Sequence, residues 1–226
     1  MDSGNYTIGL HKEGLEIEGM DLSFSMLEQA KKKAPEMHWS QGDMRDLPFL
    51  DSSFNAAMTI HTLHYVLNSL DKVFEEGFRV LKPGGTLIIL CVTLEQCLQF
   101  WLGHYFSFFW EIAYSVLPKR KDVLSSLQNA GFLNIELSPF FMTKETTDLS
   151  TYGCKYRPHL FLNPEIRAGM TPLQLPKYAK EVEVGCKILE RDIRTGAIDA
   201  VIQQHESTLG EASIILCQKP SSSSKD

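Results

Sequence analysis

The sequence lacks the cysteine pattern of a zinc site or of a disulfide framework. Its five cysteines are widely spaced, odd in number and form no CxxC pair. Free thiols of this kind predict a reducing compartment, and we expect the cytoplasm. His61 and His64 have no third candidate ligand near them in the sequence, so we also expect no metal ion.

The sequence also lacks an excess of basic residues, with 22 Lys and Arg against 28 Asp and Glu. The formal net charge is −6, which excludes a general affinity for nucleic acid. The two dense basic clusters, Lys31–Lys33 and Lys119–Lys121, are typical of solvated helix ends. The first residues show no basic-then-apolar signal pattern, so we expect no secretory leader among them.

Long hydrophobic runs are limited to one segment, LQFWLGHYFSFFWEIAYSVL at residues 98–117. It is long enough to cross a bilayer and carries a single formal charge, Glu111. Polar residues interrupt it and strand-like segments flank it, so we expect it inside the fold, with membrane association through 98–117 as the alternative. Seven aromatic residues in positions 100–110 favour core packing under residues 150–206. An apolar acceptor pocket or a membrane-facing lid are the other interpretations.

What the sequence does contain is a regular alternation of strand and helix patterns. With 226 residues and 43% hydrophobic content, the chain can bury one sizeable core. Strand patterns at 15–20, 37–40, 54–60, 86–92, 132–137 and 212–218 are separated by helix patterns, notably 24–34 and 69–81. The alternation predicts an α/β fold with a mostly parallel sheet covered on both faces.

Acidic residues follow two of these strands. Ligands bind outside the carboxyl ends of strands in such sheets. Asp21 ends the first strand pattern, 17 positions after Gly4, and a carboxylate there can accept hydrogen bonds from both ribose hydroxyls. A helix N-cap is the alternative role. Asp43 can accept from an adenine amino group and Met44 can cover the ring, with an ordinary turn as the alternative.

Two histidines follow the strand pattern 54–60. His61 and His64 are candidate bases toward a proton of a bound acceptor. Packing against the next helix, or orienting a cofactor, are the alternatives.

The order of these motifs supports a family resemblance. The stretches GMDLSFSMLEQAKKKAP, QGDMRDLPFLDSSFNAAMTIHTLHYV and FEEGFRVLKPGGTLIIL resemble class I S-adenosylmethionine-dependent methyltransferases, most closely the small-molecule group called the type 11 methyltransferase domain. The resemblance covers residues 3–93. It implies S-adenosylmethionine as cofactor and a small-molecule methyl acceptor. It further implies a set of cofactor-binding residues: Gly4, Asn5, Asp21, Leu22, Asp43, Met44 and His61.

The sequence departs from this family at its start. Relatives have a strand and a GxGxG loop before the first helix, whereas only Ser3-Gly4-Asn5 matches the end of that loop here. Asn55 also stands where relatives often have Asp. We therefore expect a Rossmann-like sheet whose first, central strand is missing. Another segment fills the gap, the sheet closes up, or the chain is marginally stable, and cofactor binding is weak.

Two functions from different classes remain open. The first is a methyltransferase acting on a small molecule, for which an apolar one is one interpretation, and the second is an impaired fragment or a non-catalytic binding module. A nicotinamide dehydrogenase would explain Asp21 but not the GDM, DLPF and LKPGG motifs. The methyl acceptor and the oligomeric state stay open. We expect six units along the chain. They are a cofactor-binding core (1–93), an aromatic cap (94–118), a core continuation (119–149), a helical cap lobe (150–206), a last strand (207–219) and a disordered tail (220–226).

Overall fold

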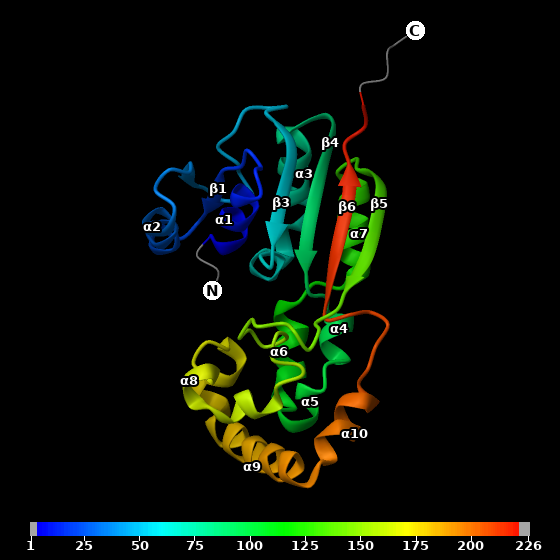
Figure 1. Cartoon of the computed structure of the whole chain (residues 1–226). Helices are drawn as coiled ribbons and strands as arrows, with labels where there is room; N and C mark the ends of the chain where they lie inside the picture. The colour runs from blue at the N-terminus through cyan, green and yellow to red at the C-terminus, as the bar shows by residue number, and fades with distance from the viewer. Residues whose placement is uncertain (1–3, 222–226) are drawn as a thin grey trace.

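The computed structural model describes residues 4–221, which form a sheet-containing part and a helical cap (Figure 1). The strands are β1 (Gly19–Asp21), β2 (Trp39–Gln41), β3 (Phe54–Ile60), β4 (Leu81–Cys91), β5 (Leu133–Phe140) and β6 (Ala212–Gln218). The helices are α1 (Asn5–Lys12), α2 (Phe24–Lys33), α3 (Leu70–Val80), α4 (Leu94–Leu98), α5 (Leu102–Tyr105), α6 (Phe108–Val116), α7 (Arg120–Asn129), α8 (Pro164–Arg167), α9 (Ala179–Thr195) and α10 (Ala197–Gln204). Short 3₁₀ turns include η1 (Leu63–Tyr65). Ser3 and most of the predicted disordered tail lie outside the described residues.

The elements form largely where local sequence signals place them. Helix α2 begins where Ser23 caps it, since the Ser23 hydroxyl accepts from the Met26 N–H. Strands β3 and β6 have the predicted bounds. Strand β4 is longer than the expected 86–92, because it already starts at Leu81 and includes residues 82–85. Gly84 has φ of +80° there, and the pairing register with β3 shifts at that point.

The strands are divided between two separate sheets. Strands β1 and β2 form a parallel pair, while the second sheet has the order β3-β4-β6-β5. Strand β3 runs parallel to β4, and β6 runs antiparallel to both of its neighbours. The α/β class is confirmed. The parallel pairing is confined to the first four strands, because β6 enters from the cap at the opposite end.

Helices bury one face of the four-stranded sheet much better than the other. Leu87, Ile89 and Cys91 alternate along β4 and are buried against α3 and α7, which lie behind the sheet (Figure 1). The residues between them, such as Ile88, are only half-buried. Helices flank the sheet as expected, and the cover is closer on the face of α3 and α7, because α1 and α2 lie beside the separate β1–β2 pair.

The gap expected from a missing central strand is present. Within residues 4–221 no strand pairs with both β1 and β3, and no backbone hydrogen bond joins the two sheets. Two of the three expected outcomes are therefore not seen in residues 4–221: no other strand fills the gap, and β1 and β3 do not pair directly. Marginal stability of the isolated chain is the outcome that remains, and it stays a prediction.

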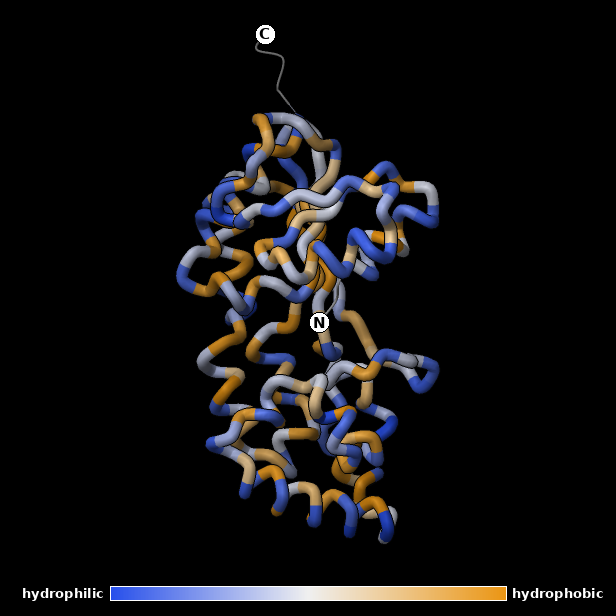
Figure 2. Tube along the Cα trace, turned by 90° about the vertical axis from the view of Figure 1, so that its left-hand side faces the viewer, coloured by the Kyte–Doolittle hydropathy of each residue, from blue (hydrophilic) through white to orange (hydrophobic). Residues whose placement is uncertain are grey.

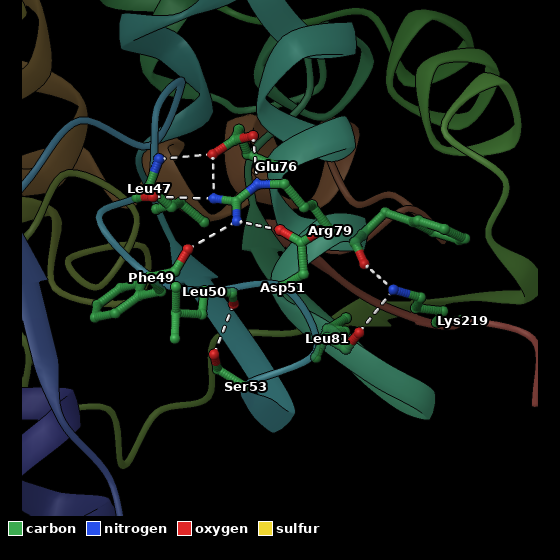
Figure 3. A network of polar contacts seen from close by, with 10 residues as sticks. Leu47, Phe49, Leu50, Asp51, Ser53, Glu76, Arg79, Leu81 and Lys219 are labelled. Atoms are coloured by element: carbon green, nitrogen blue, oxygen red, sulfur yellow. Dashed lines mark hydrogen bonds and ion pairs between the residues drawn. The ribbon is translucent and has the colours of Figure 1, made fainter.

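A polar network fastens the loop between β2 and β3 onto helix α3 (Figure 3). The Arg79 guanidinium donates to both carboxylate oxygens of Glu76, at 2.9 and 2.8 Å. It also donates to the carbonyl oxygens of Leu47 and Phe49 and to the Asp51 carboxylate. Glu76 in turn accepts from the Leu47 N–H at 2.7 Å. Side chains of one helix turn therefore satisfy the backbone of a loop that forms no ladder of its own.

The aromatic segment packs as core, as the sequence analysis favours. Phe100, Trp101 and five further large apolar side chains of the segment form a buried cluster with the 150–206 region. The Trp101 ring lies edge-on to Phe161, with centroids 5.4 Å apart. Phe108 stacks on Tyr178 with centroids 4.3 Å apart. Residues from both regions thus build one shared core, which we call the cap.

The segment 98–117 is not one continuous helix. It is divided among α4, α5 and α6, with non-helical residues between them. In residues 4–221 no helix has the length and apolar character needed to cross a membrane. Figure 2 shows hydrophilic and hydrophobic residues alternating along the outermost helix of the cap, as expected for a helix that buries one side only.

The Arg79–Glu76 network makes a prediction about stability and pH. Hydrogen bonding to Arg79 lowers the pKa of Glu76, so its stabilising contribution is complete above the unfolded-state pKa of about 4.3. That contribution disappears as the pH falls through the lower, folded-state value. Glu76→Gln should therefore lower the free energy of unfolding by about 1.5–3 kcal/mol at pH 7. The difference from wild type should shrink below about pH 4.

Urea titrations at several pH values measure both quantities. Glu75→Gln is the matched control, because Glu75 lies on the same helix and is exposed. Equal effects of the two substitutions would contradict the role given to the network.

Candidate cofactor site

The predicted site residues lie at the ends of β1, β2 and β3. Asp21 is the last residue of β1, Asp43 follows β2 after one glycine, and His61 directly follows β3. Because β1 pairs in parallel with β2, their carboxyl ends meet at one edge. The local fold therefore brings Asp21 and Asp43 to the same edge of the β1–β2 pair.

Asp21 is held in place but keeps an acceptor available. Its Oδ1 atom accepts from the Ser23 N–H at 2.7 Å. The N-cap of helix α2 is Ser23 itself, so Asp21 does not fill the N-cap role named as its alternative. Among the described residues, Oδ2 has no hydrogen-bond partner. The neighbouring Leu22 is 62% exposed. The carboxylate can thus hold the turn before helix α2 and still accept from a ligand.

Asp43 is already engaged by a neighbour that the sequence analysis did not single out. Arg45 donates to both carboxylate oxygens, at 2.6 Å from Nη2 and 2.9 Å from Nε, and its N–H adds a third bond. The hydrogen bonds from Arg45 lower the pKa of Asp43 to about 2. Met44 packs half-buried against the sheet core. An adenine amino group would therefore compete with Arg45 for the Asp43 carboxylate.

Gly4 and Asn5 serve packing in this structure. Gly4 has φ of +80° at the start of α1, and a Cβ there would lie 2.6 Å from the Trp39 ring. The Trp39 ring also covers Gly19, its partner across the β1–β2 pair. Asn5 accepts from the Lys33 ammonium at 2.7 Å. Trp39 is thus a central residue of this region, and the sequence analysis missed it because only the fold brings its ring against these two glycines.

His61 and His64 both follow β3. His61 has φ of +50°, uncommon for a residue with a side chain, and its N–H donates to the Leu90 carbonyl at 2.7 Å. His64 lies on η1 with its ring 3.9 Å from that of Tyr65. Burial lowers the pKa of His64, and the charge of His61 adds to the effect. Its imidazole is therefore neutral near pH 7 and able to accept a proton.

Other types of site are not formed in residues 4–221. No group of three or more His, Cys, Asp or Glu side chains could hold a metal ion there. Two open cavities of about 270 and 340 Å³ are lined by residues 162–190 of the cap, none of which belongs to the strand ends.

Comparisons with known proteins identify the fold. Residues 2–89 match the family described as "Methyltransferase domain". This part of the chain is therefore similar to a methyltransferase domain. A solved structure from Anabaena variabilis, described as a methyltransferase from an antibiotic biosynthesis pathway, is 27% identical with a TM-score of 0.80. That match covers 95% of this chain and 86% of the other.

Two relatives extend the comparison. Demethylmenaquinone methyltransferase of Staphylococcus saprophyticus is 33% identical over 142 residues, covering 58% of this chain and 59% of the relative. The 2-methyl-6-phytyl-1,4-hydroquinone methyltransferase of Spinacia oleracea is 28% identical over 139 residues, covering 60% and 38%. The matched part of the chain thus spans between about two-fifths and three-fifths of the length of these relatives.

The methyltransferase domain fits S-adenosylmethionine at the nucleoside end. The partnerless Oδ2 of Asp21 suits a ribose hydroxyl, and Asp43 with Met44 lies on the neighbouring loop. Gly4 and Asn5 are expected near the methionine end of the cofactor. In the structure Gly4 packs against the Trp39 ring, and Asn5 accepts a hydrogen bond from Lys33. The role of each residue toward the cofactor stays a prediction.

The role of Asp21 can be tested without disturbing helix α2. In Asp21→Asn the amide oxygen still accepts from the Ser23 N–H, whereas the charged acceptor is lost. S-adenosylmethionine affinity should fall by roughly 10- to 150-fold, as expected for a charged hydrogen bond. Calorimetry measures the dissociation constant. An unchanged value in a folded variant would show that Asp21 does not bind the ribose.

Arg45 should weaken cofactor binding by occupying Asp43. Arg45→Gln removes the charged competitor, and affinity should rise by about two- to fivefold, the modest size expected for an exposed ion pair. Added salt should raise wild-type affinity in the same direction and leave the variant nearly unchanged. If Arg45→Gln binds more weakly than wild type, Arg45 contacts the cofactor instead.

Proposed function

We propose that the chain transfers a methyl group from S-adenosylmethionine to a small apolar acceptor. The supporting observation is that an aromatic-rich cap follows directly on β4, at the carboxyl ends of the strands that carry the candidate cofactor residues. Apolar cover of this kind suits an acceptor with little charge. The match of residues 2–89 to the methyltransferase domain family supports the same reaction.

A hydroquinone-like ring is the acceptor class that we favour. The names of both relatives contain a quinone or hydroquinone, and the hydroquinone, the reduced form of such a ring, is aromatic and carries ionisable hydroxyl groups. Such a ring combines an apolar body with polar edges. An acceptor of this type would need aromatic cover and one proton acceptor near the reacting atom.

The chain's own residues would position the acceptor and move one proton. The sulfonium of S-adenosylmethionine supplies an already activated methyl group, so alignment and exclusion of water provide much of the acceleration. His64, neutral near pH 7, is the candidate base for a hydroxyl proton of the acceptor. His61, with its backbone fixed at positive φ, is placed next to the strand end where alignment matters.

A non-catalytic binding module is the second candidate function. Two observations favour it: within residues 4–221 no strand joins β1 to β3, and Arg45 forms an ion pair with Asp43. Both would weaken cofactor binding. A protein with this arrangement could retain the cap and its apolar interior while transferring no methyl group.

Equilibrium dialysis followed by a transfer assay separates the two functions. We expect saturable 1:1 binding of S-adenosylmethionine and transfer of its labelled methyl group to a short-chain prenyl hydroquinone. His64→Phe should bind the cofactor like wild type but lose about 10²- to 10⁴-fold in rate. Binding without transfer to any ring acceptor would favour the binding module. Absence of cofactor binding at millimolar concentration would overturn the proposal.

A further inference from the structure

Two cavities in the cap share one cationic side chain. The first, of about 270 Å³, lies between α8, the 3₁₀ turns at 171–178 and the start of α9. The second, of about 340 Å³, continues along α9. Arg167, Ala179 and Val182 line both, so the cavities form one groove, which we call the cap groove. Figure 1 shows α9 at the end of the cap farthest from the sheet, away from the candidate cofactor residues.

The first cavity is apolar except on one side. Its walls include Pro164, Ala168, Leu173, Leu175, Pro176 and Val182. Among the described residues that line it, Arg167 alone is charged, and Gln174 is the one other polar side chain. The Gln174 amide is already engaged, because it donates to the Arg167 carbonyl at 3.3 Å. A ligand in this cavity therefore meets aliphatic walls and a single cation.

The Arg167 guanidinium is held in place while most of its donors stay available. Its Nη1 atom donates to the Phe161 carbonyl at 2.6 Å, and Phe161 is fully buried in the cap core. Within residues 4–221 this is the only hydrogen bond of the guanidinium, and it forms no ion pair there. Lys187, which lines the second cavity, is instead paired with Glu183 at 2.6 Å. A half-buried, anchored guanidinium without an anion beside it is preorganised to bind one from solution.

The number and position of the charges select the ligand. One planar guanidinium suits one carboxylate, which it can bind through two parallel hydrogen bonds, whereas a phosphate dianion would leave a charge unmatched. Glu183 and Glu190 line the second cavity and repel an anion there. The body of the ligand therefore extends into the first cavity. That volume equals about nine water molecules of the liquid, enough for roughly ten non-hydrogen atoms.

We propose that the cap groove binds a small amphiphilic carboxylate, with the carboxylate on Arg167 and an aliphatic body in the first cavity. The carboxylate pairs the charge of Arg167, and the body covers apolar walls that include the exposed Pro164 and Pro176. The site binds its ligand without a chemical step. It lies apart from the strand ends, so it does not rest on the proposed methyl transfer.

Octanoate is the probe that tests this site. It combines one carboxylate, ionised at pH 7, with a straight aliphatic chain of matching size. Octanamide is the neutral control of the same shape, and octylammonium is the cationic one. Calorimetry without cofactor should show 1:1 binding of octanoate with a Kd of about 0.1–1 mM, the range expected for so small a ligand. Octanamide should bind at least tenfold more weakly, and octylammonium should not bind.

Two variants separate the charge from the cavity. Arg167→Gln removes the charge, whereas Ala179→Phe fills the place where the two cavities meet and keeps Arg167. Each should bind octanoate at least tenfold more weakly than wild type. Lys180→Gln is the matched control, because it removes an exposed charge at the same end of α9 but lines neither cavity, and it should bind like wild type. Circular dichroism verifies that each variant is folded.

Amide chemical shifts of the wild-type chain locate the ligand without relying on any variant. Octanoate should shift amides within residues 162–190 and leave those at the ends of β1, β2 and β3 unchanged. No binding at about ten times the expected Kd overturns the proposal, as does equal binding of octanoate and octanamide. Octanoate binding that survives Arg167→Gln or Ala179→Phe, or shifts confined to the strand ends, also overturns it. A separate titration with S-adenosylmethionine reports on the proposed function alone, so either proposal can fail without the other.

Discussion

The bidentate ion pair between Arg79 and Glu76 sets the relative position of the two sheets. Since no backbone hydrogen bond joins β1 to β3 in the described chain, the loop between β2 and β3 is their covalent connection. Arg79 satisfies three groups of that loop while Glu76 holds the guanidinium in one orientation. The pair is half-covered rather than exposed, with Glu76 buried, so solvent competes less than at an ordinary surface pair. Loss of this network would loosen the β1–β2 pair from the rest of the molecule.

A second ion pair joins the cap to the four-stranded sheet. Lys155 of the cap lies 2.6 Å from Glu211, which directly precedes β6, and both side chains are buried. Glu211 also accepts from the Met142 N–H, and the Trp101 indole donates to the Lys155 carbonyl. Buried pairs of this kind add little net stability over apolar replacements, but they penalise every alternative arrangement. The cap is thereby fixed at the carboxyl end of β4, where an acceptor would have to lie.

Much of this arrangement follows from the sequence, and the exceptions have identifiable causes. The apolar runs at 54–60 and 212–218 fix β3 and β6, and the alternation ending at Asp21 fixes the site edge. Gly4 and Asn5 match a loop motif by letter, yet their surroundings depend on Trp39 and Lys33, which only the tertiary fold brings near. The contact between Arg45 and Asp43 depends on the rotamer that the Arg45 side chain adopts, and the hydrophobic pattern of the sequence does not predict that rotamer. The open face of the sheet follows from the position of α1, set by the same packing.

The β1–α2–β2 unit can keep its shape without a central neighbour because it has a small core of its own. The Trp39 ring fills the space left by Gly4 and Gly19, and its indole N–H donates to the Ala34 carbonyl at 2.9 Å. Residues that would hold a nucleoside thus belong to one unit, while the cap and the histidines belong to the other. Methyl transfer requires the two units to be aligned to a fraction of an ångström. Reactivity should therefore depend more on how rigidly the β2–β3 loop and the strand gap join the units than on any single side chain within either of them.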